Sequence, residues 1–458
     1  MHQTNQNIIT FLLFIVIALF LIISSITYYP VLMLYFTGMI VTMILFKFLS
    51  KSDKELRDTF TIFLLTVFFG SILALFVNFD FIHNDTPFLY PDQVHFFEQA
   101  QIISLEKSFK AFMSKSLSGE YGEYSMAYAI FGGLGYIDKL ISGTVNFFPL
   151  LLSVVYTTAL IPVFLYHILK LYFPIGFVFK ATLFYGLLTP IMAYSGYLLR
   201  DMHISLLTII AFYWIVRDIR VDRVIGLILL IPIIAGFRVA NSFLILAMII
   251  IYLFAGKTSK FIRFIFLLIA SGILIYFSDL LFGGIESTQN RLSGYIELTS
   301  DAIEDSSGIG RYLYQLPIGL RELAVTIFTL SAFPFWSTIT FASTLPQYVT
   351  VIFSFITNIG SFFILVGVML NLKSIWIKTS RSKNKILLYL FLLSLLFLLI
   401  NTANMTFRRI VCIIPFIYIP FLLVYYELSE KQKRFYKIFV LISGILLSII
   451  YFLLVEIL

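Results

Sequence analysis

The sequence predicts an all-α, polytopic integral membrane protein. Hydrophobic residues make up 60% of its 458 positions, and the mean hydropathy is +0.98. Charged residues contribute 12%, roughly half of what ordinary soluble domains carry. Apolar runs of about 18 residues or more recur, and each is long enough to cross a hydrocarbon core of roughly 30 Å as a helix. Because that core offers no water to backbone polar groups, these runs are expected to be helical.

Short basic segments predict the side of the membrane on which each loop lies. Cytoplasmic loops carry an excess of Lys and Arg, so we place the basic segments in the cytoplasm. These segments are 47–57, 166–173, 217–223, 256–263, 373–385 and 430–434. The resulting alternation predicts about 13 transmembrane helices, with a cytoplasmic N-terminus and an external C-terminus. Their expected positions are 8–28, 31–47, 59–79, 146–169, 175–197, 202–216, 224–237, 241–256, 264–283, 347–372, 386–403, 410–427 and 437–457.

The first apolar run is expected to be a span and not a cleaved leader. It is long, and after the stretch TYYP it is followed at once by a second apolar run. A signal peptide has a shorter apolar core and a small-residue cleavage site. The chain is therefore predicted to be a multi-pass protein of the cell membrane.

Two external lobes interrupt what we otherwise expect to be one integral-membrane domain over 1–458. The first lobe, 80–145, contains the stretch PDQVHFFEQAQIISLEKSFKAFMSK, in which Val94, Phe97, Ile102 and Leu105 keep roughly helical spacing between charged residues. That pattern predicts an amphipathic helix at the membrane surface. The second lobe, 284–346, ends in a short apolar piece broken by proline, expected to be a re-entrant or interfacial segment.

Several functional classes are disfavoured by composition. The formal charge is +8, but Lys and Arg are spread over short loops and form no continuous basic face, so no nucleic acid partner is expected. The single cysteine, Cys412, lies in an apolar run and supports neither a disulfide framework nor a thiolate metal site. No phosphate-binding motif of the form GxxxxGK[ST] is present, so nothing indicates a nucleotide-driven motor.

Carboxylates gather in the first lobe. Asp80, Asp85, Asp92 and Glu98 lie within a short external segment of a chain that carries little charge. Asp92 follows Pro91 at the start of the amphipathic helix, where a carboxylate can simply cap exposed N–H groups. Acids close together at a membrane surface also raise each other's pKa, and one of them can then act as a general base or hold a metal. Both interpretations of Asp92 stay open from spacing alone.

Two histidines accompany these acids. His83 and His95 are candidates for ligands of a divalent metal, although a lone histidine near an interface is more commonly just polar. The sequence alone does not decide whether a metal binds. No other cofactor is indicated.

Arginines also gather on the predicted external face, where the positive-inside rule expects few. The segment TPIMAYSGYLLRDMHISLL carries Arg200 and Asp201 at one external turn, where a local ion pair is the simpler interpretation. Snorkelling toward lipid headgroups accounts for one or two such arginines but not for all of them. Arginine's planar fork suits phosphate oxygens, so the set predicts an anionic partner. The set is Arg200, Arg238, Arg311, Arg321, Arg408 and Arg409.

External arginines and carboxylates together fit an anionic, lipid-borne substrate. The arginines would hold a phosphate while a carboxylate deprotonates an attacking group. Few charged residues lie deep within the predicted spans, where an ion or proton relay would need them. The site is therefore expected at the membrane surface.

Four short patches resemble the GT-C membrane glycosyltransferases, including bacterial relatives of the protein O-mannosyltransferases. YPDQVHFFEQA is similar to the family's first external loop, with its Asp, aromatic and small residues at Asp92, Phe96 and Ala100. The segment with Pro190, Arg200 and Asp201 looks like a Pro-aromatic-basic-Asp element of the family. Arg408 or Arg409, with Pro415, resembles the family's late Arg-then-Pro helix. The stretch LSAFPFW, around Pro334 and Trp336, also looks like a segment found in such proteins.

The resemblance implies an enzyme that takes a sugar from a polyprenyl-phosphate carrier and transfers it, outside the cytoplasm, to a glycan, lipid or protein acceptor. It implies that Asp92 is the base on the acceptor hydroxyl and that Arg200, Arg238, Arg408 and Arg409 hold the carrier phosphate. Asp85 or an acid of the second lobe would assist or bind a divalent metal, which only some members use. The residues expected to support the site are Asp201, Asp80, Glu98 and His95.

The sequence also departs from the family pattern. Three predicted spans precede the acidic loop, whereas the family's catalytic loop usually follows the first span. Phe96 stands where a tyrosine is usual, and Asp85 is not in a tight acidic pair with Asp92. These differences bear on the assignment of the individual acids.

Two alternatives remain. A polymerase of O-antigen or capsule polysaccharide also has about a dozen spans, large external loops and functional arginines, and would depend on its arginines more than on Asp92. A flippase or transporter of lipid-linked saccharides would move its substrate without chemistry and would line a central cavity with polar residues in mid-span.

Overall fold

The computed structural model describes residues 30–79, 92–122, 124–217, 220–255, 343–381, 385–401 and 410–457, with single residues at 316, 317, 320, 324 and 408. Within these residues every regular element is a helix, and no strand occurs. The predicted all-α class is therefore confirmed for this part of the chain. The predicted spans 8–28 and 264–283 lie outside the described residues, as does nearly all of the second predicted lobe, 284–346.

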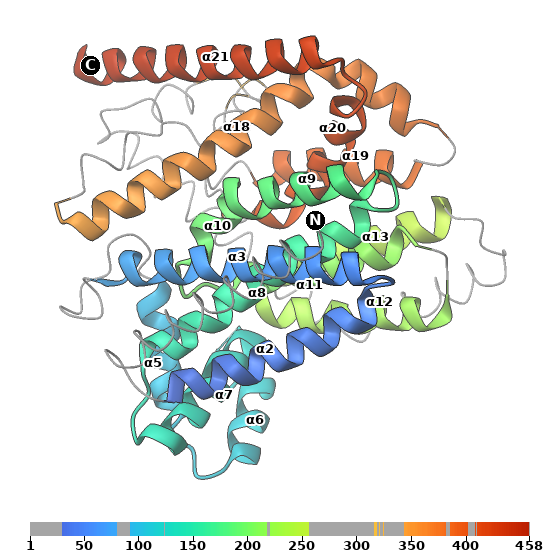
Figure 1. Cartoon of the computed structure of the whole chain (residues 1–458). Coiled ribbons are helices and arrows are strands. Elements are labelled where there is room, and N and C mark those ends of the chain that lie inside the picture. The colour runs from blue at the N-terminus through green and yellow to red at the C-terminus, as the bar shows by residue number, and fades with distance from the viewer. Residues whose placement is uncertain are drawn as a thin grey trace. The chain divides into compact units, whose positions relative to one another are not determined.

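The chain divides into two compact units. Unit 1 comprises Met1–Ile209 and Ala342–Thr357, and unit 2 comprises Ile210–Phe341 and Asn358–Leu458. The boundaries fall within α11 (Asp201–Ile215) and α18 (Leu345–Thr379). Figure 1 labels the helices of both units.

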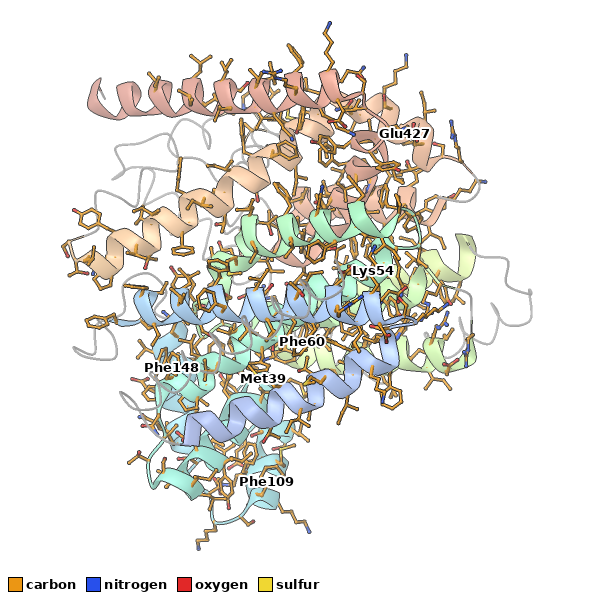
Figure 2. All side chains as sticks on the ribbon, viewed as in Figure 1. Met39, Lys54, Phe60, Phe109, Phe148 and Glu427 are labelled. Atoms are coloured by element: carbon orange, nitrogen blue, oxygen red, sulfur yellow. The ribbon has the colours of Figure 1, made fainter. Side chains whose placement is uncertain are left out.

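Unit 1 is built around α3 and α8. Its helices are α2 (Pro30–Leu49), α3 (Asp53–Val77), α5 (Asp92–Ile103), α6 (Phe109–Ser118), α7 (Ser125–Ser142), α8 (Phe147–Leu169), α9 (Ile175–Leu188) and α10 (Pro190–Ser195). α3 packs most extensively against α8, and α2, α9 and α10 also contact this pair. Buried side chains that include Met39, Phe60 and Phe148 fill the space between these helices (Figure 2).

The start of α3 is fixed by local sequence. Ser52 is the N-cap, and its hydroxyl accepts a hydrogen bond from the backbone N–H of Glu55 at 3.3 Å. The Glu55 carboxylate in turn accepts the backbone N–H of Lys51 at 2.9 Å. This reciprocal pattern resembles a capping box and satisfies donors that a helix start leaves unpaired. Consequently the helix begins at Asp53, six residues before the predicted span at 59–79.

The predicted span 175–197 is divided into two helices. α9 ends at Leu188 and α10 begins at Pro190, with Thr189 in an extended conformation between them (φ −118°, ψ 162°). A residue before proline is driven from the helical region by the proline ring, so Pro190 sets this break. α10 leads through Gly196 to Arg200 and into α11, so the break determines where the segment carrying Arg200 and Asp201 lies.

The described part of the first predicted external lobe contains three helices, which we call the α5–α7 lobe (residues 92–142). α5 and α6 both pack against α7 (Figure 1). The amphipathic stretch predicted from Pro91 onward forms two helices, because α5 ends at Ile103 and Ser108 caps a new helix by accepting the N–H of Ala111 at 3.2 Å. α6 and α7 end at Gly119 and Gly143, both at φ +80°, a conformation that glycine adopts without steric cost.

In unit 2, the pair α12 and α13 is connected to the pair α19 and α20 through a contact between α13 and α19, and α21 follows at the C-terminal side. The helices of this unit are α12 (Val221–Phe237), α13 (Val239–Ala255), α19 (Lys385–Asn401), the 3₁₀ turn η5 (Val411–Ile413), α20 (Ile414–Tyr425) and α21 (Glu430–Ile457). α13 contacts both α12 and α19, and α19 contacts α20. These bounds agree with the helices predicted near 224–237, 241–256, 386–403, 410–427 and 437–457 to within a few residues, apart from the earlier start of α21.

Length and composition identify helices that can cross a membrane. Among the described residues, α3, α8 and α18 are long and apolar enough to do so. Shorter apolar helices occur at Ile175–Leu188, Asp201–Ile215 and Val239–Leu253, and also at Thr37–Leu49, Lys385–Leu398 and Val411–Tyr425. These helices support association with a membrane; the full set of about 13 spans remains a prediction.

Candidate functional site

Two connections hold the segment between α10 and α11 in place. The Asn78 side chain at the end of α3 donates a hydrogen bond to the carbonyl of Gly196 at 2.7 Å. The backbone N–H of Leu198 donates to the Gln93 side chain of α5 at 3.1 Å. Both hydrogen bonds are buried, where a lost partner costs about 1–3 kcal/mol. The segment is therefore fixed from two sides, and the N-terminal turn of α5, with Asp92, lies beside it.

Arg200 stacks on an aromatic ring of the α5–α7 lobe. Its guanidinium carbon lies 3.4 Å from the centroid of the Tyr124 ring and 5.8 Å from that of Phe96. Arginine gains from such stacking because the negative face of the ring attracts the cation. Tyr124 is the N-cap residue of α7, so the start of this helix determines the position of the ring.

Phe96 is the centre of the aromatic packing around Arg200. Its ring centroid lies 6.2 Å from Tyr124, 6.3 Å from Tyr128 and 5.5 Å from Phe131. His95 Nε2 lies 3.1 Å from the Tyr128 hydroxyl, within hydrogen-bonding distance. We call this group the Arg200 cluster; its members are His95, Phe96, Tyr124, Tyr128 and Arg200.

The buried face of α5 differs from the stripe expected from sequence. Gln93, Phe96, Ala100 and Ile103 are buried, whereas Val94 and Phe97 are half-buried. The reason is tertiary: the Gln93 amide is needed against Leu198, so the polar residue turns inward. Asp92 is half-buried in the first turn of α5, while His95 and Glu98 are exposed.

Asp201 and His203 begin α11 next to the Arg200 cluster. Asp201 is buried in the first turn, where the partial positive charge of a helix N-terminus favours a carboxylate. His203 is also buried, and its ring makes an edge contact with Phe131 at 5.5 Å. His203 was not predicted as a site residue, although it follows Asp201 in the same sequence segment.

Unit 2 holds two of the predicted arginines, Arg238 and Arg408. Together with Asn241 and Cys412 we call them the Arg238 turn. The Asn241 amide lies 3.5 Å from the sulfur of Cys412, and both side chains are buried. Arg238 is the C-cap residue of α12 and bonds through its carbonyl to the N–H of Asn241 at 3.0 Å. Arg408 precedes Cys412 by four residues. Both arginines are half-buried. Unit 2 thus brings together two turns that are far apart in sequence.

Other predicted site residues lie outside the described residues. These are Asp80, Asp85 and Arg409, together with His83, Arg311 and Arg321. Where side chains are described, no group of three or more His, Cys, Asp or Glu residues is arranged to hold a metal ion.

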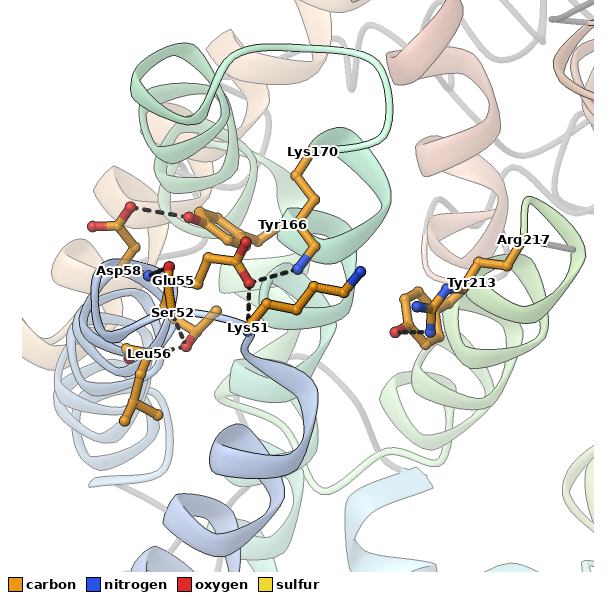
Figure 3. Close-up of polar contacts among 10 residues, drawn as sticks. Lys51, Ser52, Glu55, Leu56, Asp58, Tyr166, Lys170, Tyr213 and Arg217 are labelled. Atoms are coloured by element: carbon orange, nitrogen blue, oxygen red, sulfur yellow. Dashed lines mark hydrogen bonds and ion pairs between the residues drawn. The ribbon is translucent and has the colours of Figure 1, made fainter.

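A further polar group lies at the other end of α3, which we call the Glu55 cluster (Lys51, Glu55, Asp58, Tyr166 and Lys170; Figure 3). The Lys170 ammonium lies 2.7 Å from the Glu55 carboxylate, with side chains 14% and 11% exposed. The Tyr166 hydroxyl donates to Asp58 at 3.0 Å. These residues lie in, or next to, the basic segments 47–57 and 166–173, from which the sequence predicts only membrane orientation. Their pairing was not predicted because it depends on the packing of α3 against α8.

No family model, no curated protein and no solved structure matches this chain.

Proposed function

We propose that the chain is a multi-pass membrane glycosyltransferase that moves a sugar from a polyprenyl-phosphate-linked donor to an acceptor on the extracytoplasmic face, in assembly of a cell-surface glycan. The observation that carries this proposal is the Arg200 cluster. A guanidinium stacked on Tyr124 lies in a segment that hydrogen-bonds the first turn of α5, where Asp92 begins the helix. A cation of the kind that suits phosphate and a carboxylate are thus carried by adjoining segments.

The ring contact suits Arg200 to phosphate. A ring occupies the face of a guanidinium, whereas phosphate oxygens accept hydrogen bonds from its edge, so the two contacts are compatible. Stacking also restricts the rotamers of a long side chain, which reduces the entropy lost when a ligand binds. Arg238, Arg408 and Arg409 are proposed to supply further positive charge to the carrier phosphate.

The proposed reaction is a displacement at the anomeric carbon of the sugar. An acceptor hydroxyl oxygen forms a bond to that carbon, the bond from the carbon to the phosphate oxygen breaks, and polyprenyl phosphate leaves. Asp92 accepts the proton of the hydroxyl. Arginine stabilises the negative charge that develops on the leaving phosphate. Asp80, Asp85, Glu98, His95 and Asp201 are proposed as supporting groups, and Asp85 as the residue that would bind a divalent metal if one is used.

The test is turnover by the purified chain in proteoliposomes supplied with a panel of polyprenyl-phosphate hexoses. We expect wild-type protein to release polyprenyl phosphate and Asp92→Asn to lower kcat by a factor of about 10² to 10⁴, the usual contribution of a general base. Arg200→Ala should raise the KM for the donor. Glu120→Gln removes an exposed acid elsewhere in the α5–α7 lobe and should leave turnover unchanged.

Each alternative gives a different result. Turnover retained in Asp92→Asn but lost in Arg200→Ala would favour a polysaccharide polymerase. Movement of a lipid-linked saccharide across the bilayer without release of polyprenyl phosphate would favour a flippase. Either outcome would overturn the proposed role of Asp92.

A further inference from the structure

The α5–α7 lobe exposes large apolar side chains at one end. Leu105, which follows α5, and Leu140 of α7 are each 71% exposed, and Phe109 at the start of α6 is 51% exposed. Ile137 and Ile141 are also exposed on α7, three residues before and one residue after Leu140, so helical periodicity places all three on one side of the helix. Figure 2 shows Phe109 at the outer edge of the lobe.

Two contacts show that these side chains belong to one surface. The Lys139 ammonium donates to the carbonyl of Ser104 at 3.3 Å, which joins the residues before Leu140 and Leu105. The ring of Phe109 lies 6.0 Å from that of Tyr136, the residue before Ile137. The end of α5, the start of α6 and the C-terminal part of α7 therefore meet. We call this the Leu140 surface; it consists of Leu105, Phe109, Ile137, Leu140 and Ile141.

The connection between α5 and α6 is held in a defined conformation. The Glu106 carboxylate accepts hydrogen bonds from Tyr121 at 2.6 Å and from Lys115 at 3.0 Å. The Ser104 hydroxyl donates to the carbonyl of Gln101 at 2.6 Å, and Ser108 caps α6. Leu105 in this connection and Phe109 at the start of α6 are therefore held exposed by a hydrogen-bonded backbone.

The charge around the Leu140 surface is positive. Lys107 in the same connection and Lys110 in the first turn of α6 are both exposed, on either side of Phe109. Glu106, the acid beside them, is paired with Lys115. Large apolar side chains alternating with lysines are typical of segments that lie at the boundary between lipid headgroups and acyl chains, where the apolar groups insert and the lysines contact anionic lipid.

The size of the lobe favours this boundary over the bilayer interior. α5 and α6 have 12 and 10 residues, too few to cross a hydrocarbon core of roughly 30 Å. α7 carries the half-buried Lys139 next to Leu140, and a charged side chain is costly in hydrocarbon. If the lobe lies at this boundary, its exposed apolar side chains are in lipid and its lysines are at the headgroups, so neither kind of side chain is in an unfavourable environment.

We propose that the Leu140 surface docks the α5–α7 lobe onto the headgroup layer of an anionic membrane leaflet. This goes beyond the transfer reaction and does not depend on it. The apolar stripe predicted from sequence was Val94, Phe97, Ile102 and Leu105. Of these, Leu105 belongs to the Leu140 surface, whose other members lie at the start of α6 and on α7.

The test uses an environment-sensitive fluorophore on single cysteines in the full-length chain. With the buried Cys412 replaced by serine, Leu140→Cys and Leu105→Cys are labelled in proteoliposomes of phosphatidylcholine with or without phosphatidylglycerol. Ser118→Cys, exposed at the other end of α6, is the matched control. Lipids brominated at a shallow acyl position quench fluorophores that insert.

We expect a blue shift and bromine quenching at positions 105 and 140, stronger in vesicles that contain phosphatidylglycerol, and neither effect at position 118. Replacing Lys107 and Lys110 by glutamine should remove the dependence on phosphatidylglycerol. Emission at 105 and 140 that matches a water-exposed fluorophore would overturn the proposal. Cross-linking of two chains through either position, without bromine quenching, would overturn it in favour of a second copy.

Discussion

The two ends of α3 hold charged side chains in different ways. At its start, Glu55 pairs with Lys170 of the segment after α8, and both side chains are largely buried. At its end, Asn78 fixes Gly196, and Arg200, four residues later, lies against the rings of Tyr124 and Phe96. The two sites are about 35 Å apart along the helix, at a rise of about 1.5 Å per residue.

The difference indicates which end is suited to bind a ligand. An ion pair uses the charge and hydrogen-bonding groups of both partners, so the Glu55 cluster neutralises itself and joins two helices. A ring contacts a guanidinium through its face and restricts its rotamers, which reduces the entropy lost when an anion binds. We therefore propose a structural role for the Glu55 cluster and a binding role for the Arg200 cluster, and the following predictions test that division.

The largest effect on stability is expected from Lys170→Met. Removing one partner of a buried pair leaves the other charge uncompensated, which typically costs 3–5 kcal/mol; because this pair keeps some exposure, we expect a loss of about 3 kcal/mol. Thermal unfolding of the purified chain in detergent measures it. Polyprenyl phosphate binding by the folded protein should be unchanged.

A matched pair near the C-terminus provides the control. Lys433 and Glu430 are 2.9 Å apart, but the glutamate side chain is 90% exposed. Lys433→Met should cost less than about 1 kcal/mol, the usual range for a surface ion pair. Equal losses in Lys170→Met and Lys433→Met would show that the Glu55 cluster does not hold α3 and α8 together.

Replacing Tyr124 tests the Arg200 cluster. Tyr124→Phe keeps the ring and should preserve the donor KM, whereas Tyr124→Leu removes the stacking surface and should raise that KM about tenfold, within the range of cation–π contacts. Steady-state kinetics with a polyprenyl-phosphate sugar measure both. Because Tyr124 acts through Arg200 and not on the reacting atoms, kcat should change little.

A double-mutant cycle separates this role from a general packing defect. In an Arg200→Met background the cation is absent, so Tyr124→Leu should have no further effect on donor binding. Additive effects of the two substitutions would mean that Tyr124 supports the lobe without positioning the guanidinium.

The smallest effect concerns the pH dependence of the α5–α7 lobe. The hydrogen bond from Tyr121, with a second from Lys115, lowers the pKa of Glu106 below its usual 4.5. A lowered pKa means that these bonds stabilise the fold above the unfolded-state pKa, and that this stability is lost as the pH falls through the folded-state pKa. The stability difference between wild type and Glu106→Gln should therefore shrink as the pH is lowered from 7 to below about 4.

Asp138 provides a comparison of opposite sign. Burial raises the pKa of its carboxyl above 3.8, although hydrogen bonds from Asn146 and Ser142 oppose the shift. A raised pKa means that its contribution is fully present below the unfolded-state pKa and is lost as the pH rises through the folded-state pKa. Lowering the pH should therefore favour wild type over Asp138→Asn. Parallel pH curves for both variants would contradict the two assignments.

Helix positions were largely predictable because apolar runs and proline positions are local signals. Helices α8, α12, α13 and α19 begin and end within a few residues of their predicted bounds. The early start of α3 is also local in origin, since Ser52 and Glu55 have capping-box spacing. The break between α9 and α10 could have been found from Pro190, which was considered only as part of a resemblance.

The site was predictable only in part because its contacts are tertiary. Position relative to the predicted spans placed Asp92, Arg200 and Asp201 on one side of the membrane, and the structure brings the segments that carry them together in unit 1. Nothing in sequence spacing links Tyr124 to Arg200 or Gln93 to Leu198, because those contacts require α5 and α7 to pack against the segment before α11. The same is true of Asn241 and Cys412 in unit 2.

The most direct measurement of the central claim is the side of the membrane that each end of α3 faces. In a Cys412→Ser chain, we predict that Ser118→Cys in the α5–α7 lobe reacts with a membrane-impermeant maleimide in intact cells. Lys54→Cys beside the Glu55 cluster should react only after the membrane is permeabilised. The reverse pattern would place the Arg200 cluster in the cytoplasm and contradict a transferase site on the outer face.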